Sequence, residues 1–132
     1  MVKLTHACLI TEDVGRLSAF YREVLRTEPQ DAGPQPGEYF EFALGGAVLS
    51  LWTVQGAARQ FSAGVAAAAA NRSAMLEFAV DDVDAEYARL QRTDLGIAWV
   101  KSPTTQPWGN RAMYFRDPDG NLLNLYSLVR PA

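Results

Sequence analysis

Hydrophobic residues recur along the chain with helical spacing in two places, and each stretch follows an aspartate. Behind Asp13, apolar side chains up to Leu25 return three and four positions apart, as on one face of an amphipathic helix. A shorter stripe of the same kind follows Asp82 and ends before the segment 94–96. Aspartate is a favoured N-cap residue, so both positions predict helix starts.

Runs of β-branched and apolar residues predict the strands between these helices. The runs cover 2–11, 38–44, 47–54, 73–80, 97–101 and the two arms of 111–126, with a short edge strand expected around 28–32. Gly45-Gly46 and Asp119-Gly120 separate neighbouring runs, and glycine accepts the positive φ of a tight turn without steric cost. These dipeptides predict two hairpins, while 55–72 and 102–109 are predicted as a linker and a Pro-rich loop.

The predicted elements occur twice in the same order, which indicates an internal repeat. Asp13-Val14 matches Asp82-Val83 at an offset of 69 residues, and the two turn dipeptides match at an offset of 74. The first offset makes His6 equivalent to Met75. The second makes Ser50 equivalent to Asn124, and Trp52 equivalent to Tyr126.

The repeat predicts an α+β fold of two tandem βαβββ modules that form a curved mixed sheet around a cleft, with the helices on the outer face. We expect a single domain over 1–132, with module 1 at 2–54, a linker at 55–72 and module 2 at 73–129. Side chains alternate between the faces of a strand. Leu123 and Leu125 therefore suit the helix side and Asn124 the cleft, and the same alternation places Ser50 and Trp52 in the cleft.

Composition excludes several classes of protein. The chain has 132 residues, 48% of them apolar, which supports one folded domain and argues against disorder. No apolar run approaches the roughly 18 residues of a membrane span, and no signal peptide is evident. Cys8 is the only cysteine, so an internal disulfide is impossible and a cytoplasmic location is expected. A net charge of −3 argues against nucleic acid as a partner and is compatible with a cationic ligand.

A duplicated βαβββ module with an early histidine, His6, and the closing motif D-P-D-G-N at 117–121 resembles the vicinal oxygen chelate superfamily. That group includes glyoxalase I, bleomycin-resistance proteins, fosfomycin-modifying enzymes and extradiol dioxygenases. The resemblance covers nearly all of residues 3–128. It implies the fold, whereas function has to be argued from the site.

In metal-dependent members of the superfamily, the first strands usually supply histidines and the last strand a glutamate, and the glyoxalase-like members add a ligand from the first hairpin. By this resemblance the matching positions are His6, Met75, Asn124 and Ser50. Only the imidazole is a strong ligand for a divalent ion, because a thioether and a neutral amide bind such ions poorly. We therefore expect no metal and no other cofactor, with a divalent metal held by a shifted His6 and Glu77 site as the alternative.

His6 and Glu77 are the candidate catalytic residues, and each has a structural interpretation beside the functional one. His6 is either a buried, hydrogen-bonded imidazole or a cleft group that contacts ligand or moves a proton. Glu77 lies in the apolar strand M-L-E-F-A-V, where an unpaired carboxylate is costly. It either pairs with Arg111 or Arg116, or acts as a cleft acid toward a cationic group.

Aromatic residues extend the predicted ligand site. Trp52 and Tyr126 are expected to form an aromatic wall, and Trp108 either lines the cleft mouth or pins down its loop. Cys8 is expected to be a small buried hydrophobic residue. The full set of expected ligand-binding residues is His6, Ser50, Trp52, Met75, Glu77, Trp108, Arg111, Asn124 and Tyr126.

We therefore predict a glyoxalase- or bleomycin-resistance-like protein that binds or sequesters a small, cationic or aromatic molecule in the cleft without a bound metal. The resemblance implies a homodimer, and we expect no nucleic acid and no membrane as partner. An alternative is a metal-dependent lyase or dioxygenase that uses His6 and Glu77. A further alternative is a metal-free enzyme with Glu77 or His6 as the base.

Overall fold

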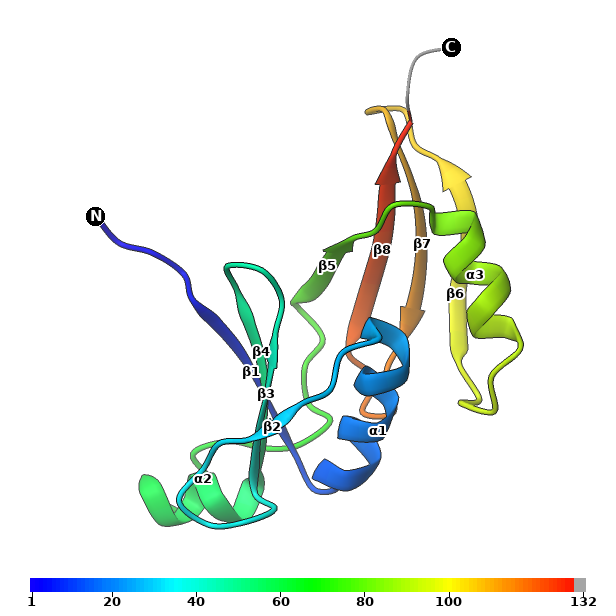
Figure 1. Cartoon of the computed structure of the whole chain (residues 1–132). Helices are drawn as coiled ribbons and strands as arrows, with labels where there is room; N and C mark the ends of the chain where they lie inside the picture. The colour runs from blue at the N-terminus through cyan, green and yellow to red at the C-terminus, as the bar shows by residue number, and fades with distance from the viewer. Residues whose placement is uncertain (130–132) are drawn as a thin grey trace. The chain divides into compact units, whose positions relative to one another are not determined.

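The computed structural model describes residues 1–129, which form two compact units, one over residues 1–70 and one from Asn71 onward. Each unit holds one four-stranded mixed sheet with a helix packed against it (Figure 1). The α+β class and the two βαβββ modules predicted from the sequence are confirmed.

The first unit contains β1 (His6–Thr11), α1 (Val14–Leu25), β2 (Gln30–Asp31), β3 (Tyr39–Ala43), β4 (Val48–Thr53) and α2 (Val54–Gln60). Its strands lie in the order β1-β4-β3-β2. The β1–β4 pair is parallel and the other two pairs are antiparallel.

The second unit repeats this plan with β5 (Met75–Ala79), α3 (Val83–Gln91), β6 (Ala98–Thr105), β7 (Asn110–Arg116) and β8 (Leu122–Leu128). Its strands lie in the order β5-β8-β7-β6, again with only the first pair parallel. The register confirms both sequence offsets. His6 lies opposite Val48 in the first sheet as Met75 lies opposite Leu122 in the second.

Both predicted N-caps are present. The Asp13 side chain accepts a hydrogen bond from the Arg16 backbone N–H at 3.0 Å, and Asp82 accepts one from the Ala85 N–H at 3.1 Å. Each bond satisfies one of the free N–H groups that every helix leaves at its first turn. The caps therefore fix where the two covering helices begin.

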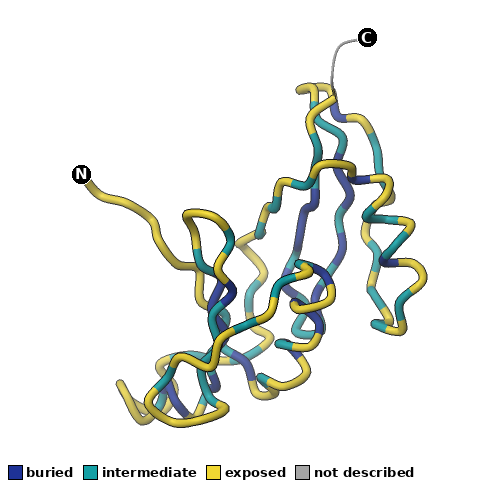
Figure 2. The backbone as a smooth tube through the Cα atoms, in the orientation of Figure 1, coloured by how far each residue is buried: buried dark blue, intermediate teal, exposed yellow. Residues whose placement is uncertain are grey.

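Each covering helix packs on the apolar face of its own sheet. On α1, Tyr21 is fully buried and its ring lies 6.3 Å from that of Phe42 on β3. On α3, Tyr87 meets Trp99 of β6 edge-to-face at 4.8 Å, and Trp99 in turn lies 5.2 Å from Phe115 of β7. Figure 2 shows buried stretches along β4, β7 and β8. Leu49, Leu51, Leu123 and Leu125 are buried, as the predicted alternation requires.

The D-P-D-G-N turn is built around the buried carboxylate of Asp117. This carboxylate accepts hydrogen bonds from the Asp119 and Asn121 backbone N–H groups, each at 2.9 Å, and from the Asn121 side-chain amide at 2.8 Å. Gly120 has φ +84°, a conformation that favours glycine. The Asn71 amide donates to the Asn121 side-chain oxygen at 3.2 Å, which ties the turn to the start of the unit.

The prediction for 55–72 is wrong in its first part. Helix α2 begins at Val54, directly after β4, and Thr53 caps it by accepting from the Gly56 N–H at 3.0 Å. The alanine run 66–70 forms no helix. Helix α2 has seven residues and contains Gly56, a weak helix former, so its sequence gives little helical signal.

The expected loop at 102–109 is also shorter than predicted. Strand β6 continues through Pro103 to Thr105. Proline lacks the N–H that a central strand needs, but β6 is an edge strand with one unpaired side, and edge strands tolerate it. Among residues 1–129, none of the helices combines the length and apolar character that crossing a bilayer requires.

Candidate functional site

Each sheet presents a second face, opposite its covering helix, that carries the predicted site residues. On the first sheet this polar face consists of His6, Cys8, Tyr39, Glu41, Ser50 and Trp52. On the second sheet it consists of Met75, Glu77, Tyr114, Asn124 and Tyr126. The alternation that buries the leucines under the helices thus gathers these side chains on one face of each sheet.

Glu41 is the centre of the hydrogen bonds on the first polar face. Its Oε2 lies 3.2 Å from His6 Nε2 and accepts a bond from the Tyr39 hydroxyl at 2.9 Å. His6 Nδ1 lies 2.9 Å from the Thr5 hydroxyl. An imidazole that donates from Nε2 to a carboxylate can accept at Nδ1, so one tautomer satisfies both contacts. His6 is exposed, and the interpretation of a buried imidazole is wrong.

Tyr39 is held as a hydrogen-bond donor. The pKa of the Tyr39 hydroxyl is raised by partial burial and by the Glu41 carboxylate that accepts its hydrogen bond, while the Ser50 hydroxyl acts in the opposite direction. The hydroxyl therefore keeps its proton at neutral pH and goes on donating to Glu41.

Cys8 is exposed, so its prediction as a buried residue is wrong. Its sulfur is nevertheless sheltered enough that burial raises the pKa of the thiol, while the nearby Ser50 hydroxyl lowers it by a smaller amount. The thiol is therefore protonated at neutral pH, which makes it a weak nucleophile and a poor metal ligand.

Two repeat-equivalent positions carry buried polar atoms without a hydrogen-bond partner. Ser50 is 1% exposed and Asn124 is 2% exposed. Within residues 1–129, the Ser50 hydroxyl and the Asn124 carbonyl oxygen meet no neighbour in hydrogen-bond geometry, although Ser50 lies close enough to Cys8 and Tyr39 to affect their pKa values. A buried polar atom left unpaired costs free energy, so these two equivalent atoms are unusual within the described residues.

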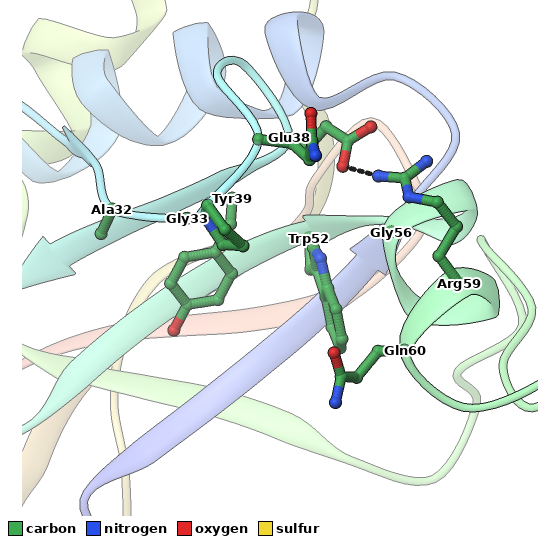
Figure 3. Close-up of a pocket in the computed structure, with 10 residues that line it drawn as sticks. Ala32, Gly33, Glu38, Tyr39, Trp52, Gly56, Arg59 and Gln60 are labelled. Atoms are coloured by element: carbon green, nitrogen blue, oxygen red, sulfur yellow. Dashed lines mark hydrogen bonds and ion pairs between the residues drawn. The ribbon is translucent and has the colours of Figure 1, made fainter.

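Beside the first polar face lies a pocket of about 420 Å³ between the β2–β3 segment, the end of β4 and α2 (Figure 3). Tyr39 and Trp52 form its aromatic walls. The Trp52 ring makes two edge-to-face contacts, one with Tyr39 at 6.3 Å and one with Phe61 at 6.0 Å between ring centroids. The lining is Ala32, Gly33, Pro34, Gln35, Glu38, Tyr39, Trp52, Gly56, Arg59 and Gln60.

Gly33 and Gly56 leave room for the aromatic residues that form the pocket walls. A Cβ at Gly56 would lie 2.4 Å from Trp52 Nε1, and a Cβ at Gly33 would lie 2.8 Å from the Cβ of Tyr39. Neither distance is sterically possible, so the observed positions of Trp52 and Tyr39 require that residues 56 and 33 have no side chain. The positions of Tyr39 and Trp52 are therefore compatible with glycine at positions 33 and 56 and not with a larger residue there.

The charged residues in this lining are Glu38 and Arg59, and they form an ion pair (Figure 3). The backbone oxygen of Glu38 accepts a hydrogen bond from the Thr53 N–H at 3.1 Å, which anchors the glutamate to β4. Arg59 reaches the carboxylate from the last turn of α2. The pocket thus contains one acid whose backbone is held by β4 and one more exposed base at the end of α2.

On the second polar face, Glu77 is paired with Asn124, and among residues 1–129 it has no arginine partner. The Asn124 amide N–H donates to Glu77 Oε1 at 3.1 Å. Arg116 donates to the Gly120 carbonyl, and Arg111 forms a two-bond ion pair with Asp84 of α3 at 2.7 and 3.0 Å. The structural interpretation of Glu77 as an arginine partner is wrong.

Arg111 was expected among the ligand-binding residues, but it lies on the helix-covered face of the second sheet. Its strand neighbour Ser127 accepts a hydrogen bond from the N–H of Val83, at the start of α3. Asn124 occupies the opposite face. Arg111 therefore holds α3 in place and is separated from the polar face by the sheet itself.

The remaining predicted residues occupy more exposed positions. Met75 is exposed at the start of the edge strand β5, and Tyr126 is partly buried on β8. Trp108 is 69% exposed in the β6–β7 turn, so the interpretation that it pins down its loop is wrong.

Sequence reasoning missed Tyr39, Glu41 and the pocket. A signal for the first two was present. Counting outward from the Gly45-Gly46 turn places Glu41 opposite Ser50 and Tyr39 opposite Trp52, as observed. The pocket had no such signal, because α2 was not expected.

Two mixed sheets of identical strand order, each with a covering helix and a polar face, define this chain as a paired βαβββ protein. It belongs to the Glyoxalase/Bleomycin resistance protein/Dioxygenase superfamily, whose model matches residues 3–125.

Solved structures support the fold over nearly the whole chain. A glyoxalase/bleomycin resistance protein/dioxygenase family enzyme from Burkholderia phytofirmans PsJN is 17% identical, with a TM-score of 0.81 over 97% of this chain and 100% of that one. A glyoxalase/bleomycin resistance protein/dioxygenase from Nocardioides is 24% identical, with a TM-score of 0.75 over 100% and 87%. A lactoylglutathione lyase from Agrobacterium tumefaciens is 25% identical, with a TM-score of 0.70 over 96% and 94%.

The curated relative that matches is the uncharacterized protein YraH of Bacillus subtilis strain 168. It is 36% identical over 56 residues, which is 42% of each of the two chains. The matched segment therefore spans less than half the length of that relative.

The fold family implies a metal centre, and the residues at the corresponding positions do not fit one. They supply one imidazole from His6, the Ser50 hydroxyl, the Met75 thioether and the Asn124 amide, and the last three are weak ligands for a divalent ion. Over residues 1–129, no three His, Cys, Asp or Glu side chains are grouped so that they can hold a metal ion.

Proposed function

We propose that this protein binds a small aromatic molecule non-covalently in the pocket of its first unit. The observation that carries the proposal is the pocket of about 420 Å³ walled by Tyr39 and Trp52. Small-molecule sites are concave, mostly apolar and supplied with a few well-placed polar groups, and their volumes are typically about 300–1,000 Å³. This pocket meets each of those criteria.

The aromatic walls suit a planar ligand. Ring pairs gain roughly 0.5–1.5 kcal/mol beyond the area they bury, and Trp52 is already fixed by its neighbours before a ligand arrives. A wall that does not have to be ordered on binding costs little conformational entropy. The hydroxyl of one wall residue, Tyr39, is held by Glu41, which lies outside the pocket lining.

The experiment is an NMR titration of the indole N–H signals with phenethyl alcohol, a neutral aromatic probe. The chain has three tryptophans, so Trp52→Phe identifies the signal of Trp52. We expect a saturable shift of that signal, with Trp99 and Trp108 unaffected as internal controls. A Trp52 signal that stays in place up to the solubility limit of phenethyl alcohol, indole and benzamide would reject the proposal.

A second candidate function is that of a metal-dependent lyase or dioxygenase using His6 and Glu77, and one comparison favours the lyase. A neighbouring structure at 25% identity carries the name lactoylglutathione lyase. The donor set argues against this candidate, since His6 has Glu41 as its carboxylate partner and Glu77 has Asn124. Elemental analysis of protein purified without chelators decides the matter, because stoichiometric Ni, Zn, Mn or Fe would favour the lyase.

We further propose that the protein is a cytoplasmic homodimer. Strands β1 and β2 are the edges of the first sheet and β5 and β6 are those of the second, and an unpaired strand edge is normally covered. The single cysteine is in keeping with a reducing compartment. Sedimentation velocity at micromolar protein gives the mass directly, and a 14.5 kDa species alone would refute the dimer.

A further inference from the structure

The Glu38–Arg59 ion pair sits in the lining of the proposed ligand pocket and supplies its charged groups. Gln35 and Gln60, which also line the pocket, have neutral side chains. The charge that the pocket presents is therefore set by whether Arg59 stays on Glu38. If the arginine leaves, a carboxylate beside two aromatic rings is exposed to an incoming molecule.

The two partners are unequally held. The Glu38 side chain is 26% exposed, and its backbone is bonded to Thr53 of β4. The Arg59 side chain is 54% exposed and extends from the last turn of the seven-residue helix α2. An exposed ion pair contributes little, because water and salt compete for both charges. Arg59 can therefore move into solvent at small cost while Glu38 remains in the pocket wall.

We propose that the Arg59 guanidinium occupies the position beside Glu38 that the ligand's cationic group takes on binding. The pocket then binds an aromatic molecule that bears an ammonium or amidinium group. On binding, the ligand's cation replaces the Arg59 guanidinium as the partner of Glu38, and its ring lies against Tyr39 and Trp52. This inference rests on the proposed function, since it names the chemical class of ligand for the same pocket.

Four features favour a cation over an anion. The faces of Trp and Tyr rings attract cations through their quadrupoles. A second carboxylate, Glu41, is hydrogen-bonded to Tyr39 on the same polar face. An anion bound to Arg59 would be left beside the anchored Glu38 carboxylate, and like charges at such close range repel. The net charge of −3 adds a weak long-range preference in the same direction.

The test compares three probes that share a phenyl ring and differ in charge: phenethylamine, phenethyl alcohol and hydrocinnamate. Dissociation constants come from the Trp52 indole N–H shift at low salt. In the wild-type chain we expect phenethylamine to bind tightest and hydrocinnamate weakest. In Arg59→Gln, phenethylamine should bind about two- to fivefold tighter, because the guanidinium that competes for Glu38 is gone. This factor corresponds to the free energy that an exposed ion pair usually contributes. In Glu38→Gln, the preference for phenethylamine over phenethyl alcohol should disappear.

Arg22→Gln is the matched control, since it removes the same charge from the exposed surface of α1, outside the pocket lining. It should leave all three dissociation constants unchanged within about twofold. Tighter phenethylamine binding in this variant would mean that net charge, and not Arg59, sets the preference, and would overturn the proposal.

Two further outcomes would overturn it while the proposed function stands. In the first, hydrocinnamate binds tightest and Arg59→Gln weakens its binding, which would make Arg59 an anion receptor. If the three probes bind equally well, the ion pair has no role in recognition. A wild-type Trp52 signal that no probe shifts would instead remove the proposed function itself, and this inference with it. If Glu38→Gln fails to fold, the wild-type probe series and Arg59→Gln still decide the question.

Discussion

The Trp52 ring stands edge-on to the ring of Tyr39, with centroids 6.3 Å apart and an angle of 89° between the planes. The two residues are directly opposite each other in the antiparallel pair of β3 and β4. Cross-strand aromatic pairs of this kind stabilise a sheet. Here the pair also forms a wall of the pocket, so the same contact supports the fold and shapes the proposed ligand site.

Gly56→Ala should destabilise the chain, although alanine normally stabilises a helix. Replacing glycine by alanine inside a helix gains up to about 1 kcal/mol. At Gly56 the added Cβ would lie 2.4 Å from Trp52 Nε1, so the indole has to move. Overpacking of this kind costs about 1–3 kcal/mol, and we expect a net loss in the free energy of unfolding measured in urea.

Gly15→Ala in α1 is the control for that experiment. Its Cβ would meet Asp13 at 3.6 Å, an ordinary contact, so the helical preference of alanine should appear as a small gain in stability. Equal effects of the two substitutions would contradict the role assigned to Gly56.

Asp117→Ala should lower the free energy of unfolding by about 1–3 kcal/mol, because it leaves two backbone N–H groups and one amide without their acceptor. Asp119→Ala, in the same turn, removes a carboxylate whose buried Oδ2 has no hydrogen-bond partner in the described part of the chain. We expect it to change stability much less. Urea unfolding of both variants checks the difference, and a larger loss at Asp119 would refute this account of the motif.

Arg111 should make stability depend on pH through Asp84. Its guanidinium, which donates two hydrogen bonds to Asp84, holds the pKa of that carboxyl below its ordinary value. A group whose pKa is depressed in the folded state contributes stability above its unfolded pKa, and this contribution is lost as pH falls through the folded value. Unfolding of the wild type and Arg111→Gln should therefore differ at pH 7 and converge in acid. A difference that grows in acid would contradict the assignment.

Cys8 should react slowly with iodoacetamide at pH 7, since burial raises the pKa of its thiol and the thiolate is the reactive form. The rate should rise with pH through a midpoint above that of a free cysteine. Ser50→Ala should move the midpoint higher still, because the Ser50 hydroxyl lowers the pKa of Cys8. A midpoint that moves down in Ser50→Ala would be inconsistent with this geometry.

The repeated fold could be predicted from the sequence because its signals are local. The aspartate caps, the helical stripes and the two turn dipeptides each depend on a few neighbouring residues, and their spacing gave the offsets that the register confirms. The alternation within β4 and β8 likewise placed Ser50 and Asn124 on the faces opposite the helices.

The pocket could not be predicted, because it depends on contacts between elements. Gly56 looks like a helix breaker in isolation, yet it is the residue that makes room for Trp52 beside α2. The partner of Arg111 lies 27 positions earlier on α3, and no local pattern connects Arg111 to Asp84. Pro103 fits within β6 because β6 is an edge strand. The strand order that places β6 at the edge cannot be seen in the sequence.

The most direct measurement of the central claim is a crystal structure of the chain soaked with phenethylamine. The account predicts electron density for the phenyl ring against Tyr39 and Trp52, with the ammonium group within hydrogen-bond distance of the Glu38 carboxylate and Arg59 turned toward solvent. Density for the probe at any other place, with Arg59 still on Glu38 and the pocket empty, would contradict it.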